Sequence, residues 1–234
     1  MTPILLLTRP EGRNAAISEA IAAKWDGPLQ VVTSPLLKIS FVASTPPDAD
    51  ALIFTSVNGV DAAVHMGLPS GQTAWCVGGR TAEAAKAAGF AVLTGPGDAQ
   101  GLIDDITSAQ PSGRLAHIRG RHTRGSVAET LTAAGLNCAD VVAYDQVPID
   151  LSEDALLALT GEIPVILPLF SPRTASILIE QGPFRAPVHV VAMSDAVAEV
   201  AAGMQKVALK VAKRPDAASV VEAAVALLAG MSSR

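Results

Sequence analysis

The chain contains one series of short motifs twice, and the order of the series differs between its two copies. An internal repeat of this kind indicates two similarly folded units. The first motifs of one copy stand at the start of the chain, whereas those of the other stand in its middle. One unit must therefore be continuous and the other split. The matching segments are Thr8-Arg9 with Ile118-Arg119, Val31-Val32 with Val141-Val142, Phe54-Thr55-Ser56 with Phe170-Ser171-Pro172, residues 77–85 with 193–201, and Asp98-Ala99 with Asp216-Ala217.

Within each copy, short apolar runs alternate with alanine-rich helical stretches. Single helices between strands are typical of parallel sheets, so the predicted fold class is α/β, with two similar parallel-sheet α/β domains. The chain crosses between them beside Pro35 and Pro148, where proline disfavours helix, so we expect a two-stranded extended linker. The active site is expected in the cleft between the domains. The predicted boundaries are 1–36 with 150–234 for the discontinuous domain, 41–144 for the inserted domain, and 37–40 with 145–149 for the linker strands.

Composition excludes several classes of protein. Of the 234 residues, 50% are hydrophobic and 17% are charged, whereas a disordered chain combines low hydrophobicity with high net charge. The net charge of −5 gives no overall basic surface for nucleic acid, although it leaves room for a local cationic pocket. No apolar run reaches the roughly 18 residues of a membrane span, and the N-terminus lacks the features of a signal peptide. We expect a cytoplasmic protein that acts as a monomer, without nucleic acid or membrane as partner.

The common catalytic and metal-binding motifs are missing. The chain has no P-loop, no dinucleotide-binding fingerprint, no HExxH and no GxSxG. No sequence motif therefore supports a kinase, a zinc peptidase or a serine hydrolase. Cys76 and Cys138 lie far apart, so we expect two buried thiols rather than a disulfide or a zinc site. The four histidines show no metal-ligand spacing, and His65 and His189 are interpreted as structural.

Polar loops follow many of the predicted strands. Helix N-termini at the carboxyl ends of parallel strands attract anions, hydroxyls add donors, and arginine binds carboxylate or phosphate bidentately. Together the loops predict a large ligand with several negative groups. Taken singly, each serine or threonine is equally compatible with a helix N-cap, and the arginine cluster with a solvated loop. The loop residues are Thr8 to Pro10, Thr55 to Gly59, Gly78 to Thr81, Arg119 to Ser126 after a strand ending at Ile118, Ser171 to Thr174, and Ser194 with Asp195.

The only tyrosine, Tyr144, closes a predicted strand beside the second crossing. A ring at that position can wedge the domain junction, and its hydroxyl can take part in proton transfer. The sequence leaves both roles open.

These features together resemble the uroporphyrinogen-III synthase family over essentially the whole chain. The family has two α/β domains, one of them split, joined by a two-stranded linker. The resemblance rests on the order and spacing of Leu5 to Pro10, Leu52 to Val60, Cys76 to Ala82, Val141 to Tyr144, and Phe170 to Ala175.

The resemblance implies a cofactor-free lyase that cyclises hydroxymethylbilane to uroporphyrinogen III with inversion of ring D and loss of water. Hydroxymethylbilane carries eight carboxylates, which suits the polar loops. Tyr144 matches the family tyrosine proposed as the general acid. Ser194 stands where other members often carry threonine. The implied substrate-binding residues are Arg9, Thr55, Ser56, Asn58, Gly78, Gly79, Thr81, Arg119, Ser171, Arg173 and Ser194, and no metal site is implied.

Other functions remain open at this stage. A non-catalytic cytoplasmic tetrapyrrole-binding or sensor protein would have the same loops. Periplasmic solute-binding proteins share the double crossing but need a secretion signal. A nucleotide-utilising transferase would have to use the turn at Gly78 and Gly79 without a P-loop.

Overall fold

The computed structural model describes residues 1–122 and 125–232 of the chain. Thr123 and Arg124, which the sequence places in the polar loop after a strand, lie outside these residues. The chain divides into two compact units. Unit 1 contains Met1–Lys38 and Pro148–Arg234, and unit 2 contains Ile39–Val147.

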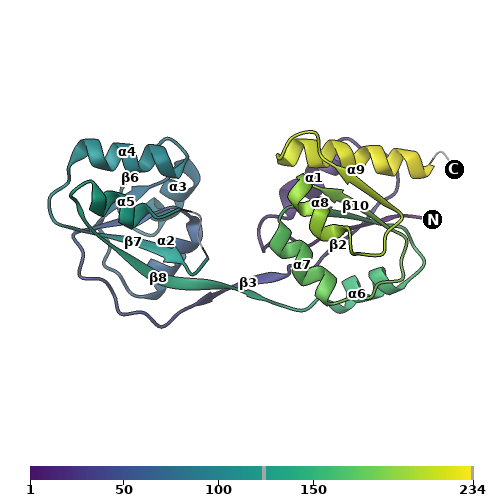
Figure 1. Cartoon of the computed structure of the whole chain (residues 1–234), viewed down its shortest axis with the longest axis horizontal. Coiled ribbons are helices and arrows are strands. Elements are labelled where there is room, and N and C mark those ends of the chain that lie inside the picture. Colours follow the sequence, from purple (N-terminus) through teal and green to yellow (C-terminus); the bar gives the residue numbers. More distant parts are fainter. Residues whose placement is uncertain (123–124, 233–234) are drawn as a thin grey trace. The chain divides into compact units, whose positions relative to one another are not determined.

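Unit 1 is built around a five-stranded parallel sheet with helices on both faces (Figure 1). Side chains alternate along a strand, so successive residues of the central strand enter opposite cores: Leu6 packs into one apolar cluster and Leu5 into the other. Burial on both faces explains why the inner strands Ile4–Leu7 and Val165–Leu169 contain only apolar residues. In spatial order the strands are β11 (Ala208–Val211), β10 (Val188–Ala192), β9 (Val165–Leu169), β1 (Ile4–Leu7) and β2 (Gln30–Thr33). The helices are α1 (Ala15–Ala22), α6 (Glu153–Thr160), α7 (Pro172–Glu180), α8 (Asp195–Ala201) and α9 (Ala217–Ser232).

Unit 2 repeats this arrangement. Its strands β6-β5-β4-β7-β8 correspond in spatial order to β11-β10-β9-β1-β2, and β3 adds a sixth strand beside β8. This mixed α/β architecture with two parallel-dominated sheets confirms the predicted fold class. In spatial order the strands are β3 (Leu37–Phe41), β8 (Asn137–Pro148), β7 (Arg114–Gly120), β4 (Ala51–Phe54), β5 (Thr73–Cys76) and β6 (Ala91–Thr94). The helices are α2 (Val57–His65), α3 (Gly79–Ala87), α4 (Ala99–Ala109) and α5 (Val127–Ala133).

The structure corrects the register of the repeat by one residue after the central strands. Ser56 is the N-cap of α2, and Ser171 is the N-cap of α7. Ser56 therefore corresponds to Ser171, not to Pro172 as the sequence alignment had it. The sequence match pairs Phe54 with Phe170, but Phe54 ends β4 whereas Phe170 lies one residue beyond the end of β9, so the two phenylalanines do not occupy equivalent positions.

A second correction concerns Arg119, which the sequence placed in a loop. Arg119 lies inside β7, because the parallel ladder with β8 continues beyond Ile118. Arg119 pairs with Val142, and a register shift then brings Gly120 opposite Tyr144. This irregularity places the Tyr144 ring directly beside a residue without a side chain.

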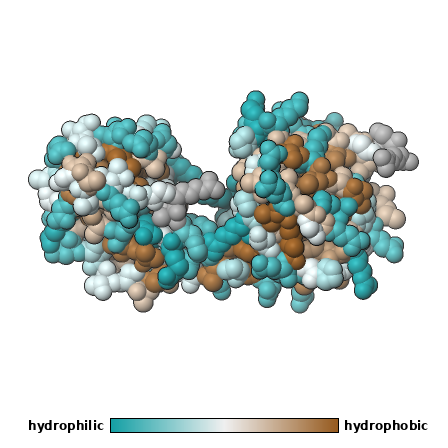
Figure 2. Space-filling model, in the orientation of Figure 1, coloured by the Kyte–Doolittle hydropathy of each residue, from teal (hydrophilic) through white to brown (hydrophobic). Residues whose placement is uncertain are grey.

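Both cysteines are free, but only Cys76 is fully buried; Cys138 is half-buried, so the expectation of two buried thiols is wrong for Cys138. Hydrophobic side chains that reach the surface are spread over both units and mixed with hydrophilic ones (Figure 2). Val64 is 53% exposed in unit 2 and Leu157 is 70% exposed in unit 1. None of the helices within residues 1–122 and 125–232 has the length and hydropathy needed to cross a membrane.

Candidate functional site

Two consecutive hydroxyl side chains, Thr55 and Ser56, follow the central strand β4 of unit 2. Because β4 is buried along its whole length, the sheet fixes where the strand ends and where these side chains begin. Each hydroxyl makes a different contact: Ser56 with Tyr144 and Thr55 with His117. The hydroxyls after β4 therefore contact two separate polar side chains, one in β7 and one in β8.

The Ser56 hydroxyl lies 2.9 Å from the Tyr144 hydroxyl. The same Ser56 oxygen accepts a hydrogen bond from the Gly59 backbone N–H at 3.2 Å, as an N-cap does. The cap fixes the serine at the start of α2, and the serine in turn holds the end of the tyrosine side chain.

The Tyr144 ring is 7% exposed and belongs to an apolar cluster with Phe54, Ile118 and Ala143. A side-chain carbon at Gly120 would lie 2.7 Å from ring atom Cε2, which is closer than carbon atoms can pack. The backbone carbonyl of Tyr144 also accepts the Arg121 N–H at 2.9 Å. The ring, the backbone carbonyl and the hydroxyl of Tyr144 thus each have a different partner that fixes their position.

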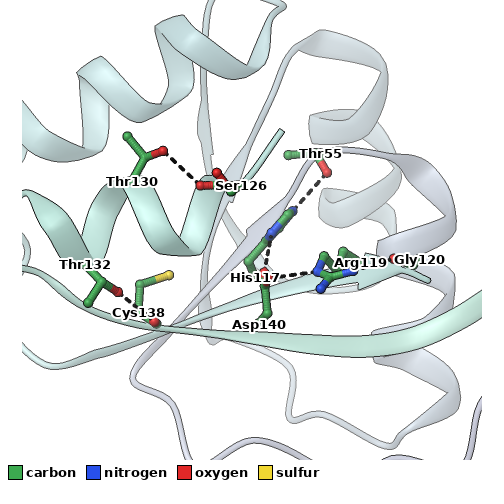
Figure 3. Close-up of polar contacts among 9 residues, drawn as sticks. All are labelled: Thr55, His117, Arg119, Gly120, Ser126, Thr130, Thr132, Cys138 and Asp140. Carbon is green, nitrogen blue, oxygen red and sulfur yellow. Dashed lines mark hydrogen bonds and ion pairs between the residues drawn. The ribbon is translucent and has the colours of Figure 1, made fainter. Parts of the chain in front are cut away.

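The Thr55 hydroxyl lies 3.1 Å from Nε2 of His117, and Nδ1 of His117 lies 3.0 Å from Oδ1 of Asp140 (Figure 3). His117 is 1% exposed. His117 lies in β7 and Asp140 in β8, Thr55 directly follows β4, and these strands lie side by side in the order β8-β7-β4. His117 and Asp140 are direct neighbours in the parallel ladder. The imidazole bridges the hydroxyl and the carboxylate.

Arg119 also contacts this carboxylate. Its Nε lies 2.9 Å from Oδ2 of Asp140, and its Nη1 donates to the carbonyl of Gly120 at 3.0 Å. The hydrogen bond from His117 is the main cause that lowers the pKa of Asp140, and the hydrogen bond and charge of Arg119 lower it further, despite the partial burial of the carboxylate. Asp140 is therefore ionised at neutral pH, and part of the donor capacity of Arg119 is used inside the protein.

The remaining predicted residues of unit 2 lie at the starts of α2 and α3. Asn58 is half-buried in the first turn of α2. Gly78 is the N-cap of α3, and a side-chain carbon there would lie 2.9 Å from Gly97, so the close approach of two backbones requires glycine. Gly79 is exposed, whereas Thr81 is 5% exposed and belongs to the helix rather than to the loop.

The predicted residues of unit 1 follow β1, β9 and β10. The guanidinium of Arg9 lies 4.2 Å from the centre of the Phe170 ring, a cation–π contact. Ser171 caps α7 and contacts the Thr174 hydroxyl at 2.8 Å, and Arg173 lies half-buried in the first turn of this helix. Ser194 is the N-cap residue of α8, but its side chain makes no capping hydrogen bond there.

His117 and Asp140 were missed by sequence reasoning. The available signal was a histidine inside an apolar strand, two positions before Arg119. Its partner could not be found without the register, because Asp140 lies 23 residues further along the chain. Within residues 1–122 and 125–232, no group of three His, Cys, Asp or Glu side chains is placed to hold a metal ion.

Comparison with known proteins gives one consistent result. The family model described as "Uroporphyrinogen-III synthase HemD" matches residues 19–222. No curated protein sequence matches the chain. Among solved structures, the chain is similar to uroporphyrinogen-III synthetase from Helicobacter pylori, with 17% identity, a TM-score of 0.62, and coverage of 97% of this chain and 100% of the other. It also matches a mutant uroporphyrinogen III synthase from Thermus thermophilus, with 17% identity, a TM-score of 0.47, and coverage of 98% and 100%.

Proposed function

The chain belongs to the uroporphyrinogen-III synthase family of cyclising lyases in tetrapyrrole biosynthesis, and from this premise we propose how its residues serve that reaction. The family closes hydroxymethylbilane to uroporphyrinogen III with inversion of ring D and loss of water. The family match over residues 19–222 is the observation that carries this function. The open question is which side chains bind the substrate and which assist the chemistry.

Departure of water is the step that needs a proton. Tyr144 donates its phenolic hydrogen to the leaving hydroxyl of hydroxymethylbilane, and the azafulvene cation that forms is attacked by the substituted carbon of ring D. The spiro intermediate breaks and recloses at the free carbon of the same ring. Loss of the hydrogen from that carbon restores the aromatic pyrrole and returns a proton to the phenolate, so the only other product is water.

The contact between Tyr144 and Ser56 supports this role. When the Ser56 hydroxyl donates to the Tyr144 oxygen, the phenolic hydrogen points away from serine and is free to be given to another group. Donation from serine also stabilises the phenolate that remains after proton transfer. A general acid of this kind is typically worth about 10²–10⁴-fold in rate.

The carboxylates of the substrate are bound by the hydroxyl, arginine and N-terminal groups of both units. In unit 2 these are Thr55, Asn58, Gly78, Gly79, Thr81 and Arg119, and in unit 1 they are Arg9, Ser171, Arg173 and Ser194. A charge-assisted hydrogen bond to a carboxylate contributes about 1.5–3 kcal/mol. Several such contacts hold the linear substrate folded, so that closure with inversion of ring D is faster than the spontaneous closure without inversion.

The experiment that tests the tyrosine role compares Tyr144→Phe with Ser56→Ala and the wild type. Tyr144→Phe keeps the buried ring and removes the donor, so kcat is expected to fall by about 10²–10⁴-fold with little loss of stability. Ser56→Ala keeps the donor and loses its orientation, so a smaller fall is expected. Full activity of Tyr144→Phe would leave positioning of the substrate as the whole mechanism.

A further inference from the structure

The Thr55–His117–Asp140 series has a property that the reaction itself does not require. It runs from a partly exposed hydroxyl, through an imidazole that is 1% exposed, to a carboxylate. Both ring nitrogens have partners, at 3.1 Å and 3.0 Å. A change in the protonation of the ring therefore directly changes the hydrogen bond between the ring and the Thr55 hydroxyl.

The position of the hydrogens follows from the chemistry of the groups. The ionised Asp140 only accepts, so Nδ1 of His117 carries a hydrogen and donates it to Oδ1. In the neutral ring Nε2 is then an acceptor, and Thr55 must donate to it. The hydrogen of the Thr55 hydroxyl is then engaged by His117. The hydroxyl presents only its lone pairs to a ligand, and these lone pairs repel a carboxylate.

Protonation of the ring reverses the second hydrogen bond. In the imidazolium Nε2 carries a hydrogen and donates it to the Thr55 oxygen. The threonine hydrogen then becomes available to a carboxylate outside the series. The same proton adds a positive charge next to the bound anion, between two carboxylates.

We propose that His117 and Asp140 are positioning residues that couple carboxylate binding at Thr55 to proton uptake: protonation of His117 frees the Thr55 hydroxyl from donating to the ring, so that it donates to the carboxylate of the ligand instead. This inference rests on the proposed function, because it assigns a substrate carboxylate to Thr55. It goes beyond that function by stating which protonation state of the enzyme binds the substrate.

The described surroundings of His117 agree with a single proton-accepting group. On β8, Asp140 faces the ring and Cys138 lies beside it; burial raises the pKa of that thiol to about 11, so it stays neutral. On β7, Arg119 contacts Asp140 rather than the ring. From α5, Glu129 lines a shallow hollow together with Cys138 and Asp140, with its own side chain exposed. From β4 and α4, the neighbours in this core are apolar: Ala51 and Ile53, and Leu102, Ile103 and Ile106.

The first test measures KM and kcat for hydroxymethylbilane between about pH 6 and 8, where histidine changes charge. If binding takes up one proton, KM of the wild type rises with pH, by up to about tenfold per pH unit, while kcat changes less. Thr55→Val keeps the shape of the side chain, and His117→Gln keeps a polar group that does not ionise. In both variants the rise of KM with pH is expected to disappear.

His65→Gln is the matched control, because His65 is exposed at the end of α2 and stacks on the Phe41 ring. It is expected to keep the wild-type pH profile. If the wild type makes isomer III but has the same KM–pH profile as His117→Gln, the proposed coupling is refuted and the proposed function stands. A wild type that makes only isomer I would refute the function on which the coupling rests.

A second test does not depend on the folding of His117→Gln. The ring signals of His117 in the wild type are assigned by elimination, with the variants His65→Gln, His122→Gln and His189→Gln. They are then followed by nuclear magnetic resonance at about pH 7.5. Addition of uroporphyrinogen III under anaerobic conditions is expected to convert the His117 signals from the neutral Nδ1–H tautomer to the imidazolium. A saturated complex in which the tautomer is unchanged would overturn the proposal.

Discussion

Gly120→Ala tests whether the position of the Tyr144 hydroxyl matters. The added carbon would lie 2.7 Å from Cε2 and 2.9 Å from Cζ of the tyrosine ring, and non-bonded carbons pack at about 3.5–4.0 Å. The ring must therefore move by about 1 Å. Because it is buried in an apolar cluster, this movement disturbs its neighbours, and such overpacking typically costs about 1–3 kcal/mol.

The movement also affects the hydroxyl. The Tyr144 oxygen is 2.9 Å from Ser56, and a shift of about 1 Å breaks that contact and misplaces the donor. Misplacement by about 1 Å can cost on the order of 10²-fold in rate. Gly120→Ala is therefore expected to lower the free energy of unfolding by about 1–3 kcal/mol and to lower kcat by about 10²-fold.

The assay combines denaturant unfolding with the rate of uroporphyrinogen III formation. Gly230→Ala is the matched control, since Gly230 lies in α9 with open space around the added carbon. Alanine there is expected to leave activity unchanged and to stabilise the helix by about 0.5–1 kcal/mol. Wild-type kcat and stability for Gly120→Ala would refute the packing argument and, with it, the need for a fixed tyrosine.

Two further predictions concern charge. The hydrogen bond from Arg214, followed by that from the Ser219 N–H, lowers the pKa of Asp216 to about 2, so the contribution of Asp216 to stability is present above about pH 4 and is lost as pH falls towards about 2. Asp216→Asn keeps an acceptor at the N-terminus of α9 and is expected to be less stable than the wild type at pH 6 but equally stable near pH 2, as measured by unfolding across this pH range. A difference in stability that persists near pH 2 would contradict the assignment. Each of Arg9→Ala, Arg119→Ala and Arg173→Ala is expected to raise KM by about tenfold or more, which corresponds to the loss of one charge-assisted hydrogen bond, with a smaller effect on kcat. If all three variants keep the wild-type KM, these arginines do not bind the substrate.

Much of the fold could be predicted because local signals agree with the tertiary structure. Strands buried on both faces, such as β4 and β9, appear in the sequence as short runs of apolar residues. Ser56 and Ser171 could be identified as possible N-caps because they directly precede helical stretches. The α/β class and the parallel sheets follow from this alternation.

The errors arose where position depends on pairing between strands. Arg119 was placed in a loop because polar residues begin there, but the ladder to β8 keeps it in the strand. The alignment of Ser56 with Pro172 failed because it matched Phe54 with Phe170, although Phe54 ends its strand and Phe170 lies one residue beyond the end of β9. His117 and Asp140 became a pair only through the register of β7 and β8, which no local pattern specifies.

The measurement closest to the central claim is the identity of the product isomer. The purified chain is given hydroxymethylbilane at neutral pH, the products are oxidised, and the uroporphyrin isomers are separated and quantified beside a reaction without protein. Spontaneous closure gives isomer I. We predict that the chain gives isomer III in excess, in proportion to its concentration; isomer I alone, at the rate of the protein-free reaction, would contradict the assignment.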